Sequence, residues 1–156
     1  MAKTVYIAPD AVITGDVELG EHVSVWYGAV LRGDDGPITV GAGTNIQDRC
    51  ILHEKTVVGK NCTLGHGAIV HGCTIGDNTL VGMGAIVLTG AVIGSNCVIG
   101  AGALVTGKTV APDGSLLLGS PAKVVKPATA EQIEENRAGA ARYIALAQQN
   151  LPAKEI

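Results

Sequence analysis

The sequence predicts an all-β fold of stacked parallel coils, followed by one C-terminal α-helix. Three observations predict it: an aliphatic residue recurs every six positions, small residues and glycine recur beside it, and a helical pattern begins only near residue 129. Of the 156 residues, 47% are hydrophobic and 22 are Gly, whereas only 3% are aromatic and none is Phe. Such a core is filled by repeated Val, Ile, Leu and Ala rather than by large rings.

The six-residue period is interrupted by a three-residue insertion after Leu31 and a one-residue deletion after Val70. The positions on it are Ile7, Ile13, Leu19, Val25, Leu31, Val40, Ile46, Leu52, Val58, Leu64, Val70, Ile75, Val81, Val87, Ile93, Ile99 and Val105. Neither the two-residue period of a strand nor the 3.6-residue period of a helix produces this spacing. A short strand followed by a tight corner does, with one aliphatic side chain pointing inward on each side.

Small side chains lie four residues after most of these aliphatic positions. They are Ala11, Ala29, Thr44, Cys50, Thr56, Cys62, Ala68, Thr79, Ala85, Ala91, Cys97, Ala103 and Thr109. We interpret the three cysteines in this set as buried small hydrophobes, while the place of Cys73, in the shortened repeat, stays open. The chain has no Cys-x-x-Cys pair and its N-terminus has no long apolar stretch, so we expect a reducing, cytoplasmic location.

The chain divides into three predicted parts: a coil domain over residues 1–118, an irregular exit strap over 119–128, and a helix over 129–151. Gly119 and Pro121 are typical of an irregular strap. Thr129 and Gln132 have the spacing of a capping box at a helix start. An apolar stripe follows, so we expect the helix to pack on a face of the coils; it consists of Ile133, Ala140, Ile144, Ala147 and Leu151.

Net charge and the length of the apolar runs each exclude one class of partner. The net charge is −3 and Lys and Arg are not clustered, so we expect no nucleic acid. Every apolar run is interrupted before it reaches membrane-span length, so we expect no membrane partner.

Over residues 7 to about 110 the repeat resembles the left-handed parallel β-helix of hexapeptide-repeat proteins. The resemblance implies a triangular coil of 18 residues, a left hand and strands stacked ~4.8 Å apart.

Three of the four histidines fall within nineteen residues: His53, His66 and His71. His53 and His71 each follow an inward aliphatic residue and are 18 residues apart, so we expect them to stack and point outward, with Arg32 in the same column. Two such imidazoles can bind one Zn²⁺. His66 belongs to the preceding side of the coil, around a corner from His71. We therefore expect it to bind the same metal only from a neighbouring molecule in a closed ring. The alternative is that all three are solvated surface residues.

An ordered set of motifs makes a more specific resemblance. The γ-class carbonic anhydrases carry an Arg-x-Asp, an Asn-x-Gln-Asp and three metal-binding histidines in this order. This sequence has Arg32-Gly-Asp34, Asn45-Ile-Gln47-Asp48, and then the three histidines.

The resemblance implies a homotrimeric lyase that hydrates CO₂ to bicarbonate, with metal sites shared between adjacent subunits. Zn²⁺ is the expected metal, with Fe²⁺ or Co²⁺ also compatible with imidazole. Three imidazoles leave a fourth position for water, whose pKa falls to about 7, so that metal-bound hydroxide attacks CO₂.

Further roles follow from the same resemblance. Gln47 would contact the bound solvent or CO₂ and Asn45 would orient Gln47. Arg32, Asp34 and Asp48 would hold the subunit interface, the alternative being an ordinary surface ion pair. Tyr143 would reach the pocket or pack on the helix.

One departure from the family pattern affects activity. Typical members carry an acidic loop with a proton-shuttling glutamate between the first two metal histidines, and only thirteen residues separate His53 from His66 here. We consider Asp35 and Glu54 as substitute proton relays, the alternative for Glu54 being a solvated strand residue. Activity varies among members without the loop.

Three competing functions stay open. They are a thioesterase acting on coenzyme A esters, a non-catalytic metal-binding structural subunit and, below both, a metal-free acyltransferase.

Overall fold

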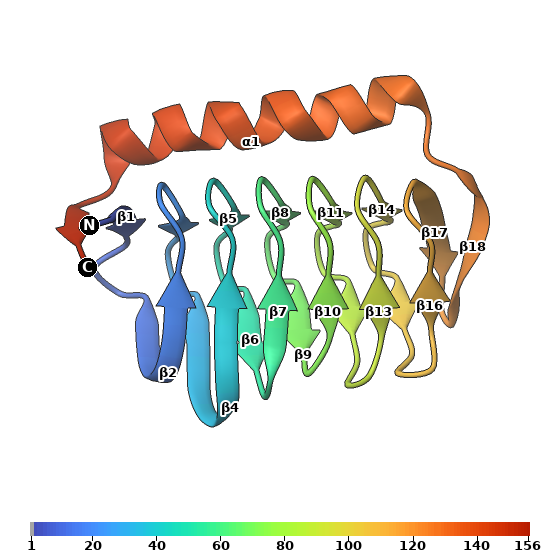
Figure 1. The fold of residues 1–156 in the computed structure, drawn as a ribbon, viewed down its shortest axis with the longest axis horizontal. Helices are drawn as coiled ribbons and strands as arrows, with labels where there is room; N and C mark the ends of the chain where they lie inside the picture. The colour runs from blue at the N-terminus through green and yellow to red at the C-terminus, as the bar shows by residue number, and fades with distance from the viewer. Residues whose placement is uncertain (1) are drawn as a thin grey trace.

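The structure is a computed structural model that describes residues 2–156 as a row of stacked coils with one long helix laid along it (Figure 1). Short strands alternate with tight corners, and each strand pairs in parallel with its equivalents in the coils before and after. The predicted fold class, a parallel β-helix of hexapeptide repeats with a C-terminal helix, is confirmed.

One side of the coils is a nine-stranded sheet, which we call the helix face. Its parallel strands are β1 (Thr4–Ile7), β3 (Ser24–Val25), β5 (Asn45–Ile46), β8 (Thr63–Leu64), β11 (Leu80–Val81), β14 (Val98–Ile99) and β17 (Ser115–Gly119). An antiparallel strand closes each end: β18 (Ala122–Pro127) beside β17 and β19 (Ala153–Glu155) beside β1. The end strands of the parallel stack, β1 and β17, are therefore paired on both edges, and the short antiparallel strands β18 and β19 form the edges of the sheet.

The other two sides form a second sheet that is continuous around a corner. The long strands β2 (Val12–Leu19) and β4 (Val30–Val40) run past the corner and belong to both sides. The first side, called here the histidine face, continues with β6 (Ile51–His53), β9 (Ile69–His71), β12 (Ile86–Val87) and β15 (Leu104–Val105). The second, the third face, continues with β7 (Thr56–Val58), β10 (Thr74–Ile75), β13 (Val92–Ile93) and β16 (Val110–Ala111).

The core is the interior of the coils, as the period predicts. Of the predicted aliphatic positions, only Ile7 and Ile13, in the first coil, are partly rather than fully buried. Gly82 shows why glycine follows the inward residue: a Cβ there would lie 2.5 Å from the backbone nitrogen of Ala101 in the next coil.

All four cysteines are buried and free, Cys73 included. Burial raises the pKa of the Cys50 and Cys73 thiols to about 12 and that of Cys62 to about 11, so these thiols stay protonated at neutral pH.

The helix α1 (Ala130–Asn150) runs back along the helix face from the last coil towards the first, so the chain ends lie close together (Figure 1). It begins with the predicted capping box: Thr129 accepts from the backbone of Gln132, whose side chain accepts from the backbone of Thr129. Ala140 and Ala147 are buried against the coils, as predicted. Among residues 2–156, no helix is both long and apolar enough to cross a membrane.

The exit segment is more regular than the sequence predicts. Residues 119–128 were expected to be an irregular strap, yet Ala122–Pro127 form β18, which pairs antiparallel with β17 through a bulge. Gly119 is the last residue of β17, and only Ser120 and Pro121 form the turn between the two strands. The strand β19 after the helix was not predicted either.

Candidate functional site

The predicted column of site residues is present on the histidine face. Arg32 pairs in register with His53, and His53 with His71. The two imidazole rings meet edge to face with their centroids 5.3 Å apart. With Asp34, which joins Arg32 at 3.0 Å, these residues form what we call the column cluster.

The hydrogen-bond partners of His53 indicate which of its ring nitrogens carries the hydrogen. Its Nδ1 lies 2.8 Å from the backbone carbonyl oxygen of Arg32, which can only accept, so Nδ1 carries the hydrogen. Its Nε2 then has the free lone pair, and the Arg32 guanidinium donates to it at 3.1 Å. A cation therefore already lies at the atom that a metal ion would use.

His71 is anchored in a different way. Its Nδ1 lies 2.9 Å from the Thr89 hydroxyl oxygen, and that hydroxyl donates to the Glu54 carboxylate at 2.8 Å. The interpretation of Glu54 as a merely solvated strand residue is therefore wrong. Asp35, the other relay considered, is exposed beside Asp34.

The remaining predicted residues lie around the corner, between the helix face and the histidine face. His66 is in the corner between β8 and β9, half exposed, with Nδ1 3.1 Å from the Asp48 carboxylate. Asp48 occupies the equivalent corner of the coil before. Together with Asn45, Gln47 and Tyr143, these two residues form the corner cluster.

Within the corner cluster, Asn45 fixes the orientation of Gln47. The Asn45 amide nitrogen donates to the backbone carbonyl of Cys62 at 3.2 Å and to the Thr63 hydroxyl at 2.9 Å, so its oxygen is the free acceptor. Gln47 donates to that oxygen at 3.0 Å. Both amides are buried, and the Gln47 carbonyl oxygen and second N–H are left for a ligand.

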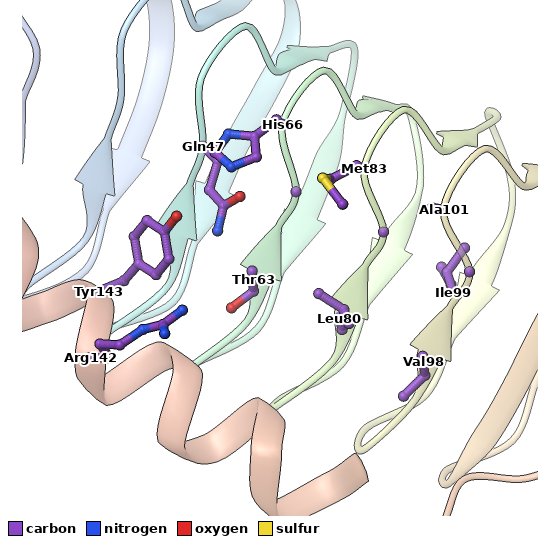
Figure 2. A pocket seen from close by; sticks show the side chains of 13 residues that line it. Gln47, Thr63, His66, Leu80, Met83, Val98, Ile99, Ala101, Arg142 and Tyr143 are labelled. Atoms are coloured by element: carbon purple, nitrogen blue, oxygen red, sulfur yellow. The ribbon is translucent and has the colours of Figure 1, made fainter.

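Tyr143 comes to this cluster from α1. Its ring meets Trp26 edge to face, with centroids 5.5 Å apart. Burial, reinforced by the Asp48 carboxylate, raises the pKa of the Tyr143 phenol, so the hydroxyl stays a hydrogen-bond donor. Figure 2 shows this hydroxyl directed towards Gln47 and His66.

A cavity of about 440 Å³ opens beside the corner cluster, between α1 and the coils (Figure 2). Gln47, His66 and Tyr143 lie at one end, and Leu80 and Val98 line the other. None of the column cluster lines it.

Two parts of the predicted site do not meet within one chain. Among residues 2–156, no three His, Cys, Asp or Glu side chains could hold a metal ion together. Within one chain, Asp48 contacts His66, whereas Arg32 and Asp34 contact each other; their role at a subunit interface stays a prediction. His22, the fourth histidine, stacks on Tyr6 in the first coils.

Sequence reasoning missed several residues near the site. Thr89 and Arg142 carry no motif, and only the fold brings them to His71 and to the cavity. The outward residues of the histidine face were detectable, because each directly precedes an inward aliphatic and all are aliphatic: Val12, Val30, Ile51, Ile69, Ile86 and Leu104.

Comparison with known proteins identifies the class. A solved hexapeptide transferase family protein from Anaplasma phagocytophilum superposes with a TM-score of 0.86 at 42% identity, covering 94% of this chain and 93% of the other. Residues 35–120 match the family model described as the GMPPB C-terminal domain. The chain is thus a hexapeptide-repeat β-helix protein carrying a histidine cluster.

Sequence relatives identify the family within that class. A protein named "Probable carbonic anhydrase" from Methanocaldococcus jannaschii is 51% identical, over 95% of this chain and 96% of the relative. "Gamma carbonic anhydrase 2, mitochondrial" from Arabidopsis thaliana is 44% identical over 94% of this chain, which spans 56% of that relative's length. The chain belongs to the γ-class carbonic anhydrase family. Cytoplasmic localisation stays a prediction.

Proposed function

We propose that this protein is a metal-dependent carbonic anhydrase that hydrates CO₂ to bicarbonate, with each metal site shared between adjacent copies in a homotrimer. Membership of the family supports the activity. The single observation that carries the shared site is the division of one chain's site residues into a column cluster and a corner cluster.

The residues fit a divalent metal. Each of the three imidazoles has its Nδ1 in contact with an oxygen: the Arg32 carbonyl for His53, the Asp48 carboxylate for His66 and the Thr89 hydroxyl for His71. This pattern is typical of metal-binding histidines, whose other nitrogen then ligates. The Arg32 guanidinium at the Nε2 atom of His53 supports a site for positive charge, and metal binding requires Arg32 to move aside.

The third ligand would come from a neighbour. His66 lies in the corner between β8 and β9 and does not join His53 and His71 in one metal-binding group within the described chain, whereas the corner of an adjacent copy can face their column. Corner against column is a heterologous contact, and three such contacts close a ring. Each site then receives two imidazoles from one chain and one imidazole, Gln47 and Tyr143 from the next.

The histidine face supports this assembly. Its outward side chains are aliphatic along the whole stack, and Ile51 remains 41% exposed in the single chain. The third face instead mixes Glu18, Thr39 and Thr74 with valines. An aliphatic face beside the candidate ligands is the surface expected to be covered by a partner.

When bound, a divalent metal held by three imidazoles supplies hydroxide at neutral pH by lowering the pKa of water to about 7. This chain's residues would then orient the reactants. Gln47, held by Asn45, presents a carbonyl oxygen and one N–H that can accept from solvent and donate to a CO₂ oxygen. Tyr143 adds a protonated phenol at the same end of the cavity, and the apolar lining beyond it suits CO₂. Zn²⁺ is the expected metal, with Fe²⁺ and Co²⁺ as alternatives.

The test is CO₂ hydration by stopped flow on protein loaded anaerobically with Zn²⁺ or Fe²⁺. We expect hydration above the metal-free control with at least one metal. Absence of hydration with both metals would contradict the proposed activity.

A second function, a thioesterase acting on coenzyme A esters, is favoured by one observation. The cavity of about 440 Å³ is far larger than CO₂ needs, and Leu80, Met83 and Val98 could take an acyl group. A panel of acyl-CoA esters in the same experiment tests this function. A non-catalytic metal-binding subunit predicts stoichiometric metal with neither activity.

A further inference from the structure

The one-residue deletion in the repeat brings two distant side chains together beside His71. The corner between β9 and β10 is one residue shorter than the corners of the coils before and after it: five residues separate Val70 from Ile75, but six separate Leu52 from Val58 and Val87 from Ile93. Glu54 and Thr89 lie in those longer flanking corners. Although 35 residues apart, they form a hydrogen bond of 2.8 Å across the short corner.

The short corner leaves room for this contact because it carries a glycine. Gly72 has a φ of +61°, and a Cβ at this position would lie 2.7 Å from both the Glu54 Oε2 and the Thr89 Oγ1. Any other residue at position 72 would therefore push the two side chains apart.

The contact decides which nitrogen of His71 carries its hydrogen. His53 and His66 face a carbonyl and a carboxylate, which can only accept, but His71 faces a hydroxyl, which can donate or accept. The Glu54 carboxylate cannot donate, so Thr89 donates to Glu54. The Thr89 oxygen must then accept from His71 Nδ1, which leaves the Nε2 lone pair of His71 free.

We propose that Glu54 and Thr89 are positioning residues that hold His71 in the Nδ1–H form, with Nε2 directed to the metal. This inference rests on the proposed metal site. Without Glu54, the Thr89 hydroxyl can donate to Nδ1 and place the hydrogen on Nε2, where it blocks ligation. Partners of this kind are worth 10–100-fold in metal affinity in other metal sites.

The test begins with chelator-treated protein carrying ¹⁵N-labelled histidine, at pH 8, where most imidazoles are neutral. Imidazole ¹H–¹⁵N correlation spectra report the tautomer directly, and a His71→Gln variant assigns the His71 signals among four histidines. Wild-type protein is expected to show His71 as Nδ1–H. Glu54→Ala is expected to give a mixture, and Glu54→Gln to restore the Nδ1–H form because its amide oxygen can still accept from Thr89.

Zn²⁺ affinity, measured by chelator competition, is the second measurement. We expect Glu54→Ala to weaken binding about 10-fold and Glu54→Gln to stay near wild type. The double variant Glu54→Ala/Thr89→Val, which removes the hydroxyl as well, is also expected to give a mixed tautomer. His53 is the internal control, since its partner is a backbone carbonyl.

Wild-type His71 protonated at Nε2, or a Glu54→Ala variant with an unchanged tautomer and Zn²⁺ affinity, would overturn the inference. A wild-type protein that binds no Zn²⁺ would overturn the proposed function instead. The tautomer spectra need no metal, so they still decide the role of Glu54 and Thr89 in that case.

Discussion

The column cluster and the corner cluster differ in how the fold holds them. His53 and His71 belong to neighbouring strands, so sheet register alone stacks their rings 5.3 Å apart, and the His53 side chain is only 15% exposed. His66 projects from a corner, 48% exposed, with its Nδ1 3.1 Å from the Asp48 carboxylate. Sheet register thus places two of the proposed ligands side by side on one face, whereas the third projects from a corner. Under the proposed shared site, a second copy supplies that third ligand.

The largest expected effect is the loss of metal from either cluster. His53→Ala and His66→Ala should each reduce Zn²⁺ binding more than about 100-fold, because two imidazoles alone form an incomplete tetrahedral site. Metal analysis of purified protein checks this, with His22→Ala as the matched control. Near-stoichiometric metal in His66→Ala would show that the corner cluster is not part of the site.

The next effect concerns assembly. Ile51→Lys puts a charge on the histidine face and should convert trimers to monomers, because a buried lysine without a partner is costly. Val92→Lys is the matched control, since Val92 is similarly exposed on the third face. Sedimentation velocity checks both variants. A trimeric Ile51→Lys protein would mean that another face forms the contact.

A smaller effect separates ligand binding from catalysis. Gln47→Ala should lower kcat/KM for CO₂ hydration by about 10–100-fold, because it removes an oriented donor from the reacting oxygens. Zn²⁺ affinity should stay unchanged, since Gln47 donates its hydrogen bond to Asn45 and is not one of the proposed ligands. Stopped-flow rates and chelator competition measured on the same sample distinguish these effects. Parallel losses of rate and metal would instead assign Gln47 to the metal site.

The smallest effect concerns two buried cysteines, one near each cluster in the sequence. Cys50 is buried just after Asp48 and Cys73 just after His71, and burial raises both thiol pKa values from 9.0 to about 12. Between pH 9 and 12 the unfolded chain loses thiol protons that the folded protein keeps, so stability is fully present below pH 9 and falls as pH rises. Each thiol should contribute about 1.4 kcal/mol per pH unit.

Urea unfolding of metal-free protein at pH 9.5 and pH 10.5 measures this slope. Cys50→Ala and Cys73→Ala should each reduce it by one thiol's share. Slopes identical to wild type in both variants would contradict the assigned burial of these thiols.

Much of the fold was predictable because one physical requirement repeats: each side of each coil buries one aliphatic residue. The same spacing predicts the column of Arg32, His53 and His71, since register follows from counting. The strand Ala122–Pro127 was not predictable in this way, because it pairs antiparallel, outside the repeat. The contact of Glu54 with Thr89 was also out of reach, because it depends on a hydrogen bond across a shortened corner rather than on any local motif.

The most direct test of the shared site mixes two defective chains. His53→Ala chains keep an intact corner, and His66→Ala chains keep an intact column. Random co-assembly into trimers should restore about a quarter of the wild-type Zn²⁺ sites, because about three quarters of the trimers contain both chains and each of these has one complete site. Recovery of Zn²⁺ binding and CO₂ hydration near that fraction is the predicted result. Mixed trimers that bind no more Zn²⁺ than the separate variants would contradict a site built from two chains.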